Sequence, residues 1–154
     1  MKYFFSFILI ILSLTSCVST KKLNTKESIS SVINKARTYI GTPYKWGGTS
    51  SKGIDCSGLL VRSFQSIGIN IPRTTSEQIY LGKKVNLKKS KEGDLVFFAF
   101  GKKKRKVTHV GLISDVKSTN NIDFIHASSS KGVIETKLIK EYYLKRIRSI
   151  RRIL

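Results

Sequence analysis

The sequence DCSGLLVRSFQSIG, residues 55–68, has the pattern of a helix with a polar start and one buried face. Asp55 is a favoured N-cap, because its side chain can accept hydrogen bonds from the unpaired amides of the first turn. Apolar side chains then recur at helical spacing, and Gly68 is a common helix stop. We therefore predict a helix with Cys56 at or next to its first residue.

The predicted position of Cys56 bears on its reactivity. Unpaired N–H groups and the dipole at a helix N-terminus favour negative charge, so we expect them to lower the pKa of the thiol. The thiolate is the nucleophilic form, and the same amides can stabilise a tetrahedral oxyanion. A cysteine is more often a small buried side chain, but here Asp55 and Ser57 make the position polar. Cys56 is therefore the candidate nucleophile.

The chain contains two histidines, and these are the candidate bases. His109 lies near the start of one predicted strand, residues 107–114, and His126 lies near the end of the next, residues 122–127. If these strands pair antiparallel, both imidazoles meet at one edge of the sheet. Such a meeting would place a base beside a group that orients it, as in catalytic triads.

The remaining patterns indicate the fold class. Apolar spacing after Asn24 predicts a helix that ends near Gly41, and Thr74 begins a shorter helix over residues 75–81. Residues 42–54 contain several glycines and a proline and are predicted to be a loop. Helices first and strands afterwards indicate an α+β domain, with N-terminal helices packed on an antiparallel sheet of about five to six strands. Those strands are expected at residues 95–100, 107–114, 122–127, 133–136 and 144–150.

Residues 1–16 are predicted to be a signal peptide. Lys2 precedes an apolar run of about a dozen residues, short of the roughly 20 that a membrane-spanning helix needs. Small residues then precede Cys17, as in the lipobox of bacterial lipoproteins. We expect cleavage before Cys17, a lipidated tether over residues 17–24 and one domain over residues 25–154. A plain secretory signal is the alternative.

The net charge of +20 concerns partners rather than fold. Nucleic acid would be the usual partner of so basic a protein in the cytoplasm, but the predicted export signal argues against it. Anionic wall polymers and lipid head groups are expected instead. The basic run at residues 102–106 is interpreted as a solvated hairpin tip.

The two cysteines of the chain could be joined in a disulfide or could remain unpaired. An even count in an exported protein is compatible with a disulfide. If Cys17 carries lipid, however, Cys56 stays a free thiol, and such a thiol outside the cytosol is a candidate reactive group.

Successive blocks of the chain resemble the NlpC family of papain-like cysteine endopeptidases of the bacterial cell wall. The resemblance covers about residue 28 to the C-terminus, and its blocks are YKWGG at 44–48, DCSGL at 55–59, PR at 72–73, EGDLVFF at 92–98, THVG at 108–111 and FIHA at 124–127. It implies a papain-like fold and acyl transfer. In that reaction Cys56 attacks the scissile carbonyl, His109 handles the proton, and His126 orients His109.

The resemblance also implies how substrate is bound. The Tyr44 hydroxyl would help to bind the oxyanion, and Asp55 and Ser57 would hold the free amino end of a stem peptide. Simple N-capping is the alternative role for Asp55.

The implied substrate is peptidoglycan, cut at the γ-D-glutamyl–diamino acid bond or at the D-alanyl cross-link, with no metal or cofactor. The implied location is the cell envelope, anchored to a bacterial membrane through acylated Cys17. In a Gram-negative cell we expect the outer membrane.

Two other functions compete with this hypothesis. A zinc hydrolase would use Cys56, His109 and His126 as three metal ligands, which is an allowed set, although the long spacings disfavour it. A non-catalytic basic lipoprotein would instead bind wall polymers, and would have no need of a nucleophile and two histidines.

Overall fold

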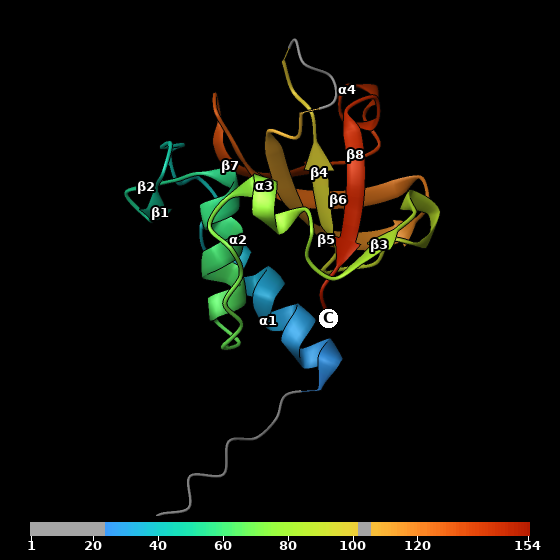
Figure 1. Ribbon diagram of the computed structural model, residues 1–154, viewed down its shortest axis with the longest axis horizontal. Helices are drawn as coiled ribbons and strands as arrows, with labels where there is room; N and C mark the ends of the chain where they lie inside the picture. Colours follow the sequence, from blue (N-terminus) through green and yellow to red (C-terminus); the bar gives the residue numbers. More distant parts are fainter. Residues whose placement is uncertain (1–23, 102–105) are drawn as a thin grey trace, which may run out of the picture.

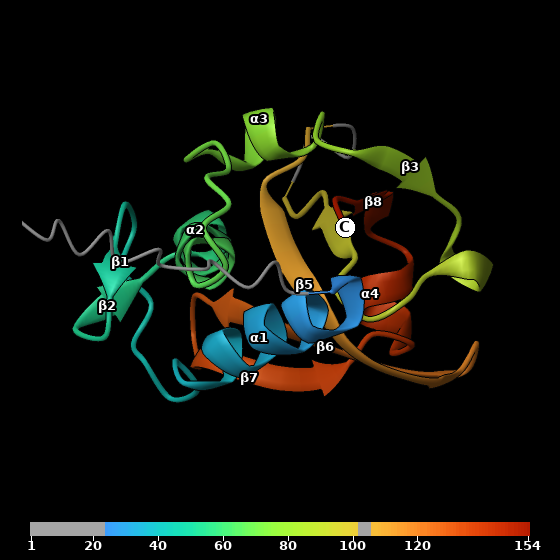
Figure 2. The same cartoon turned by 90° about the horizontal axis from the view of Figure 1, so that it is seen from below.

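The computed structural model describes residues 24–101 and 106–154, and these form helices packed on a six-stranded antiparallel sheet. The strand order is β3 (Lys83–Val85), β8 (Ile147–Arg152), β4 (Leu95–Phe98), β5 (His109–Ser118), β6 (Asn121–Ser128) and β7 (Gly132–Lys137). Helices α1 (Thr25–Arg37) and α2 (Cys56–Gln65) lie together on one side of this sheet (Figures 1 and 2). The predicted α+β architecture is confirmed.

Both faces of the sheet are covered by apolar side chains. Alternate residues of β4 point to opposite faces, as the strand period requires, so the whole strand is buried. On the helix side, the core joins α1 and α2 to the sheet through Val32, Ile33, Leu59, Leu60, Phe64, Leu95, Phe97, Val110, Leu112 and Ile125. On the other side, the short helix α4 (Glu141–Leu144) places Tyr143 against a second cluster that includes Val96, Phe98, Ile113, Phe124 and Ile150.

Several predicted element bounds need correction. Helix α1 ends at Arg37 rather than near Gly41, and β5 extends to Ser118 rather than to residue 114. Residues 42–54 are not all loop, because β1 (Thr49–Ser50) and β2 (Gly53–Ile54) form a small hairpin there. Helix α3 (Thr75–Gln78) has only four residues and stops short of residue 81. The segment 144–150, predicted as one strand, is divided between the end of α4 at Leu144 and β8, which begins at Ile147.

Two further short elements carry no sequence signal of their own. The edge strand β3 has exposed lysines and pairs only with β8, so this pairing defines it. The turn η1 (Leu87–Lys89) follows it.

Several predictions fall on residues that the structure does not describe. These are the signal peptide, the lipid anchor at Cys17 and most of the basic run at residues 102–106. Among the helices of the described segments, none has the length and apolar character needed to cross a bilayer.

Candidate active site

Cys56 is the first residue of α2, as predicted. Asp55 caps the helix, and its Oδ1 accepts a hydrogen bond of 2.7 Å from the amide of Gly58. The Cys56 side chain is a free thiol with only 6% of its surface exposed. Its Sγ lies 3.7 Å from the hydroxyl oxygen of Thr75, the first residue of α3. The start of α3 therefore places a hydroxyl group next to the sulfur of the candidate nucleophile.

Burial raises the pKa of the Cys56 thiol above its ordinary value, and the charge of Asp55 acts in the same direction. Hydrogen bonds from the Thr75 hydroxyl and from the backbone at Val110 and Ser57 oppose this rise in pKa without cancelling it. The sequence-based expectation of a lowered thiol pKa is therefore wrong. A helix N-terminus favours the anion, but the loss of solvent around the sulfur outweighs it.

The two histidines meet as the sequence predicts. Because β5 pairs antiparallel with β6, the start of one strand lies beside the end of the other. His109 Nε2 lies 2.8 Å from His126 Nδ1, and the two rings are perpendicular, at 90°. Since this hydrogen bond uses Nε2 of His109, its Nδ1 is the nitrogen left to exchange a proton with a thiol.

Both imidazoles are held in the neutral form at neutral pH. Burial, reinforced by the charge of His126, lowers the pKa of His109 to about 3. Burial alone lowers the pKa of His126 to about 4. A neutral His109 can accept a proton, so it meets the first requirement of a general base.

The ring of His126 is positioned by two aromatic neighbours. Phe124 stacks on it with a centroid distance of 4.7 Å and an interplanar angle of 10°. The Tyr143 hydroxyl oxygen lies 3.3 Å from His126 Nε2. Neither Tyr143 nor Thr75 could be predicted from local sequence, because both reach the site from elements distant in sequence and no local motif marks them.

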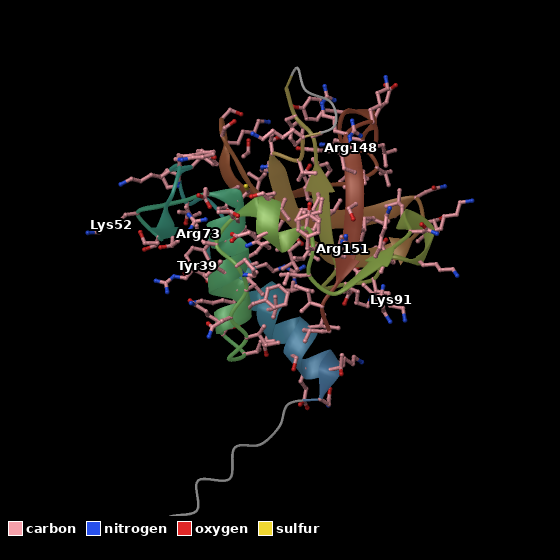
Figure 3. The ribbon with its side chains drawn as sticks, viewed as in Figure 1. Tyr39, Lys52, Arg73, Lys91, Arg148 and Arg151 are labelled. Carbon is pink, nitrogen blue, oxygen red and sulfur yellow. The ribbon has the colours of Figure 1, made fainter. Side chains whose placement is uncertain are left out.

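Asp55 and Ser57 belong to a closed hydrogen-bond network with Arg73. The guanidinium donates to Asp55 Oδ1 at 2.9 Å and Oδ2 at 2.7 Å, and to Ser57 Oγ at 2.8 Å. The amide of Gly47 also donates to Asp55 Oδ2, at 2.8 Å. Figure 3 shows Arg73 alongside α2.

This network determines the ionisation state of Asp55. Burial opposes its ionisation, but the hydrogen bonds from Arg73 and from the Gly58 amide hold its pKa below the ordinary value. The N-cap role of Asp55 is thus confirmed. The binding of a substrate amino group by Asp55 and Ser57 stays a prediction.

Tyr44 approaches the nucleophile from the glycine-rich loop. It forms an isolated parallel bridge with Ile54, two residues before Cys56. Burial raises the pKa of the Tyr44 hydroxyl, and the charges of Cys56 and Asp55 raise it further. The hydroxyl is therefore protonated at neutral pH and able to donate a hydrogen bond.

A cavity of about 540 Å³ opens beside Tyr44 and the histidine pair. Tyr44, His109 and His126 line one part of it, and Lys131 and Lys140 line another. The cavity thus places basic and aromatic groups next to the histidine pair. Among residues 24–101 and 106–154, no group of three or more His, Cys, Asp or Glu side chains is arranged to hold a metal ion.

Comparison with known proteins identifies the family. The NlpC/P60 family pattern matches residues 41–152, so the chain belongs to the NlpC/P60 family. The chain is 39% identical over 129 residues to a probable endopeptidase NlpC homolog of Haemophilus influenzae. It is 38% identical over 126 residues to the murein DD-endopeptidase MepS/murein LD-carboxypeptidase of Escherichia coli K12.

These alignments cover most of this chain but less of the relatives. They span 83% and 81% of this chain and 63% of the length of each relative. The crystal structure of a NlpC/P60 family protein from Bacillus cereus superposes with a TM-score of 0.73 at 32% identity, covering 82% of this chain and 40% of that one. The papain-like fold implied by the sequence is confirmed.

Proposed function

We propose that this protein hydrolyses peptide bonds of peptidoglycan, with Cys56 as nucleophile, His109 as general base and His126 as the group that orients His109. The observation that carries the proposal is the hydrogen bond of 2.8 Å between His109 Nε2 and His126 Nδ1. Together with a free thiol at the start of α2, it supports a nucleophile, base and orienter of the kind that acyl-transfer enzymes use.

The reaction begins from a neutral thiol and a neutral imidazole. As Cys56 Sγ attacks the scissile carbonyl carbon, the thiol proton passes to His109 Nδ1. The carbonyl oxygen becomes an oxyanion, which accepts hydrogen bonds from the Tyr44 hydroxyl and from the Cys56 amide at the helix N-terminus. The C–N bond then breaks as His109 Nδ1 returns the proton to the leaving amine, and a thioester remains on Cys56.

Hydrolysis of the thioester uses the same groups. His109 Nδ1 takes a proton from a water molecule as the water oxygen attacks the thioester carbonyl. The C–S bond breaks, the peptide leaves with a new carboxyl group, and the proton returns to the sulfur. Because burial lowers the pKa of His109 to about 3, its imidazole is unprotonated at neutral pH and can accept the proton released in each attack.

The substrate is a peptide of peptidoglycan, cut at the γ-D-glutamyl–diamino acid bond or at the D-alanyl cross-link. The murein activity in the name of the Escherichia coli relative supports this substrate class. Lys131 and Lys140 in the cavity also suit the carboxylate groups that such peptides carry. The protein acts in the cell envelope, held at a membrane by acylation of Cys17, and in the outer membrane in a Gram-negative cell.

Digestion of purified peptidoglycan tests the proposal. The full chain, Cys56→Ala and Cys56→Ser are incubated with peptidoglycan sacculi, and the released fragments are identified by mass spectrometry. We expect the unsubstituted chain to release fragments and both variants to release none. The masses of the fragments identify the bond that is cleaved. Equal release by Cys56→Ala would refute the proposal, and binding without any release would favour the wall-binding alternative.

A further inference from the structure

The hydrogen bonds at the histidine pair continue to a third side chain. His109 Nε2 contacts His126 Nδ1 at 2.8 Å, and His126 Nε2 contacts the Tyr143 hydroxyl oxygen at 3.3 Å. Both ring nitrogens of His126 are therefore engaged. Tyr143 comes from α4, which also forms part of the wall of the cavity beside the site.

A neutral imidazole has one donor nitrogen and one acceptor nitrogen, so only two arrangements of protons fit this chain. In the first, His109 Nε2–H donates to His126 Nδ1, and His126 Nε2–H donates to the Tyr143 oxygen. In the second, every hydrogen bond is reversed, and Tyr143 donates. Only the first arrangement leaves His109 Nδ1 unprotonated.

We propose that Tyr143 is a positioning residue, whose hydroxyl oxygen accepts a hydrogen bond from His126 Nε2–H and thereby keeps His109 in the tautomer that can act as a base. The inference rests on the proposed function, because that function requires His109 Nδ1 to take the thiol proton. No proton travels along the chain. Each N–H group stays on its nitrogen and sets the direction of the next hydrogen bond.

The surroundings of Tyr143 support this role. His126 is only 4% exposed, so without an acceptor its Nε2–H would lose its hydrogen-bond partner at a nearly buried position. The Tyr143 ring is fixed against Phe124 at 4.9 Å and Phe98 at 5.9 Å between centroids. The hydroxyl oxygen is thus held towards His126 by packing as well as by its hydrogen bond.

Acceptance by Tyr143 also strengthens His126 as a partner for His109. When His109 becomes positively charged during attack, its Nε2–H donates to His126 Nδ1. An imidazole that donates from one nitrogen is a better acceptor at the other, as in histidine ligands that donate to a carbonyl or carboxylate. Tyr143 therefore contributes to the rate of the chemical step and not to substrate affinity.

Tyr143→Phe tests the inference because it removes the hydroxyl and keeps the ring packing. The matched control is Tyr39→Phe, which removes the hydroxyl of another half-buried tyrosine near α1 and α2, away from α4 (Figure 3). We expect kcat on muropeptides to fall about tenfold in Tyr143→Phe with KM within twofold, and both constants to stay within twofold in Tyr39→Phe.

Histidine 15N NMR reports the tautomers directly and requires no activity. In the wild type we expect Nε2–H on both histidines, and in Tyr143→Phe a mixture of tautomers on His126. A wild-type spectrum with Nδ1–H on His126 would overturn the inference, as would an unchanged tautomer and kcat in Tyr143→Phe. A wild type that cuts no peptidoglycan would refute the proposed function, whereas the NMR result would still decide the tautomer.

Discussion

The guanidinium of Arg73 and the carboxylate of Asp55 form two parallel hydrogen bonds, of 2.9 and 2.7 Å, immediately before the candidate nucleophile. The same guanidinium contacts the carbonyl of Gly48 at 3.3 Å. One ion pair therefore joins the glycine-rich loop, the start of α2 and the segment that leads to α3. The position of Cys56 depends on all three segments.

We expect Arg73→Ala to destabilise the protein and impair catalysis. It leaves the nearly buried Asp55 carboxylate without its cationic partner, and we expect a cost of about 2–3 kcal/mol in the free energy of unfolding. We expect kcat to fall at least tenfold, because the segments that position Cys56 are no longer joined by the Asp55–Arg73 ion pair. Urea unfolding and muropeptide digestion measure the two effects.

Arg37→Ala is the matched control for Arg73→Ala. Arg37 also forms a two-point contact with a carboxylate, that of Glu135, but on an exposed surface away from Cys56. We expect a cost below about 1 kcal/mol and normal activity. Equal effects of the two variants would show that the Asp55–Arg73 pair has no special role.

The pH dependence of thiol alkylation tests whether the free protein holds a neutral pair. Burial raises the pKa of Cys56 above its ordinary value of 9.0 and lowers the pKa of His109 to about 3. Between these values the thiol is protonated and the imidazole is not. We expect the rate of alkylation by iodoacetamide to rise about tenfold per pH unit from pH 6 to pH 8.

Mass spectrometry of the peptide that contains Cys56 separates this reaction from any at Cys17. Thr75→Val should slow alkylation further, because the Thr75 hydroxyl lowers the thiol pKa, and Thr75→Ser should restore the rate. A rate that is constant from pH 5 to pH 8 would instead indicate a preformed thiolate–imidazolium pair and contradict the prediction.

Acid should destabilise the folded protein through the same histidines. In the unfolded chain each histidine binds a proton below its ordinary pKa of 6.5, but the folded-state pKa values are about 3 for His109 and about 4 for His126. The unfolded state therefore binds more protons in this interval, and stability falls as the pH falls. We expect a loss of about 1–2 kcal/mol per histidine between pH 6.5 and pH 5.

Urea unfolding at several pH values measures this loss. His126→Asn removes one titrating group, so the pH dependence of its stability should be about half that of the wild type. Carboxylates with lowered pKa values, such as Asp55, titrate below this interval and do not interfere. An unfolding free energy that stays constant from pH 6.5 to pH 5 would contradict the burial of both rings.

Gly111 makes room for the ring that supports His126. A Cβ atom at Gly111 would lie 2.6 Å from Phe124 Cδ2 and 3.0 Å from the carbonyl oxygen of Ile125. We expect Gly111→Ala to cost about 1–3 kcal/mol of stability through overpacking and to reduce kcat at least tenfold by moving Phe124 off His126. Thermal unfolding and muropeptide kinetics give the two values.

Gly68→Ala separates the effect on activity from the effect on stability. Gly68 has a φ of 76° with open space around it, so alanine there is strained but displaces no neighbour. We expect a loss of about 1 kcal/mol with normal kcat. Activity that falls in both variants in proportion to stability would argue against a specific role for Gly111.

Much of the site could be predicted because it depends on local order in the chain. The N-cap at Asp55 places Cys56 at a helix start, and this follows from neighbouring residues alone. The meeting of His109 and His126 follows from two consecutive strands that pair antiparallel. In each case the spacing along the sequence restricts where the side chains can lie.

The sequence of β4 shows how far such local signals extend. Its unbroken apolar run predicts a strand buried on both faces, and the structure confirms this. The segment 144–150 is also predicted as one strand, yet its first residue ends α4 and the chain then continues as β8. Three apolar residues among the seven of this segment are compatible with either a helix or a strand, and packing on the second cluster selects between the two.

By itself, the sequence determined the helix that presents Cys56, the strand pair that joins the histidines and the order of the family blocks, because these depend on contacts between near neighbours. Only the tertiary structure decided the ionisation of Cys56 and the partner of His126. The thiol pKa depends on how completely the packed chain excludes water, and Tyr143 reaches His126 from an element 17 residues further along the chain. No local pattern encodes either quantity, because both arise when distant segments fold together.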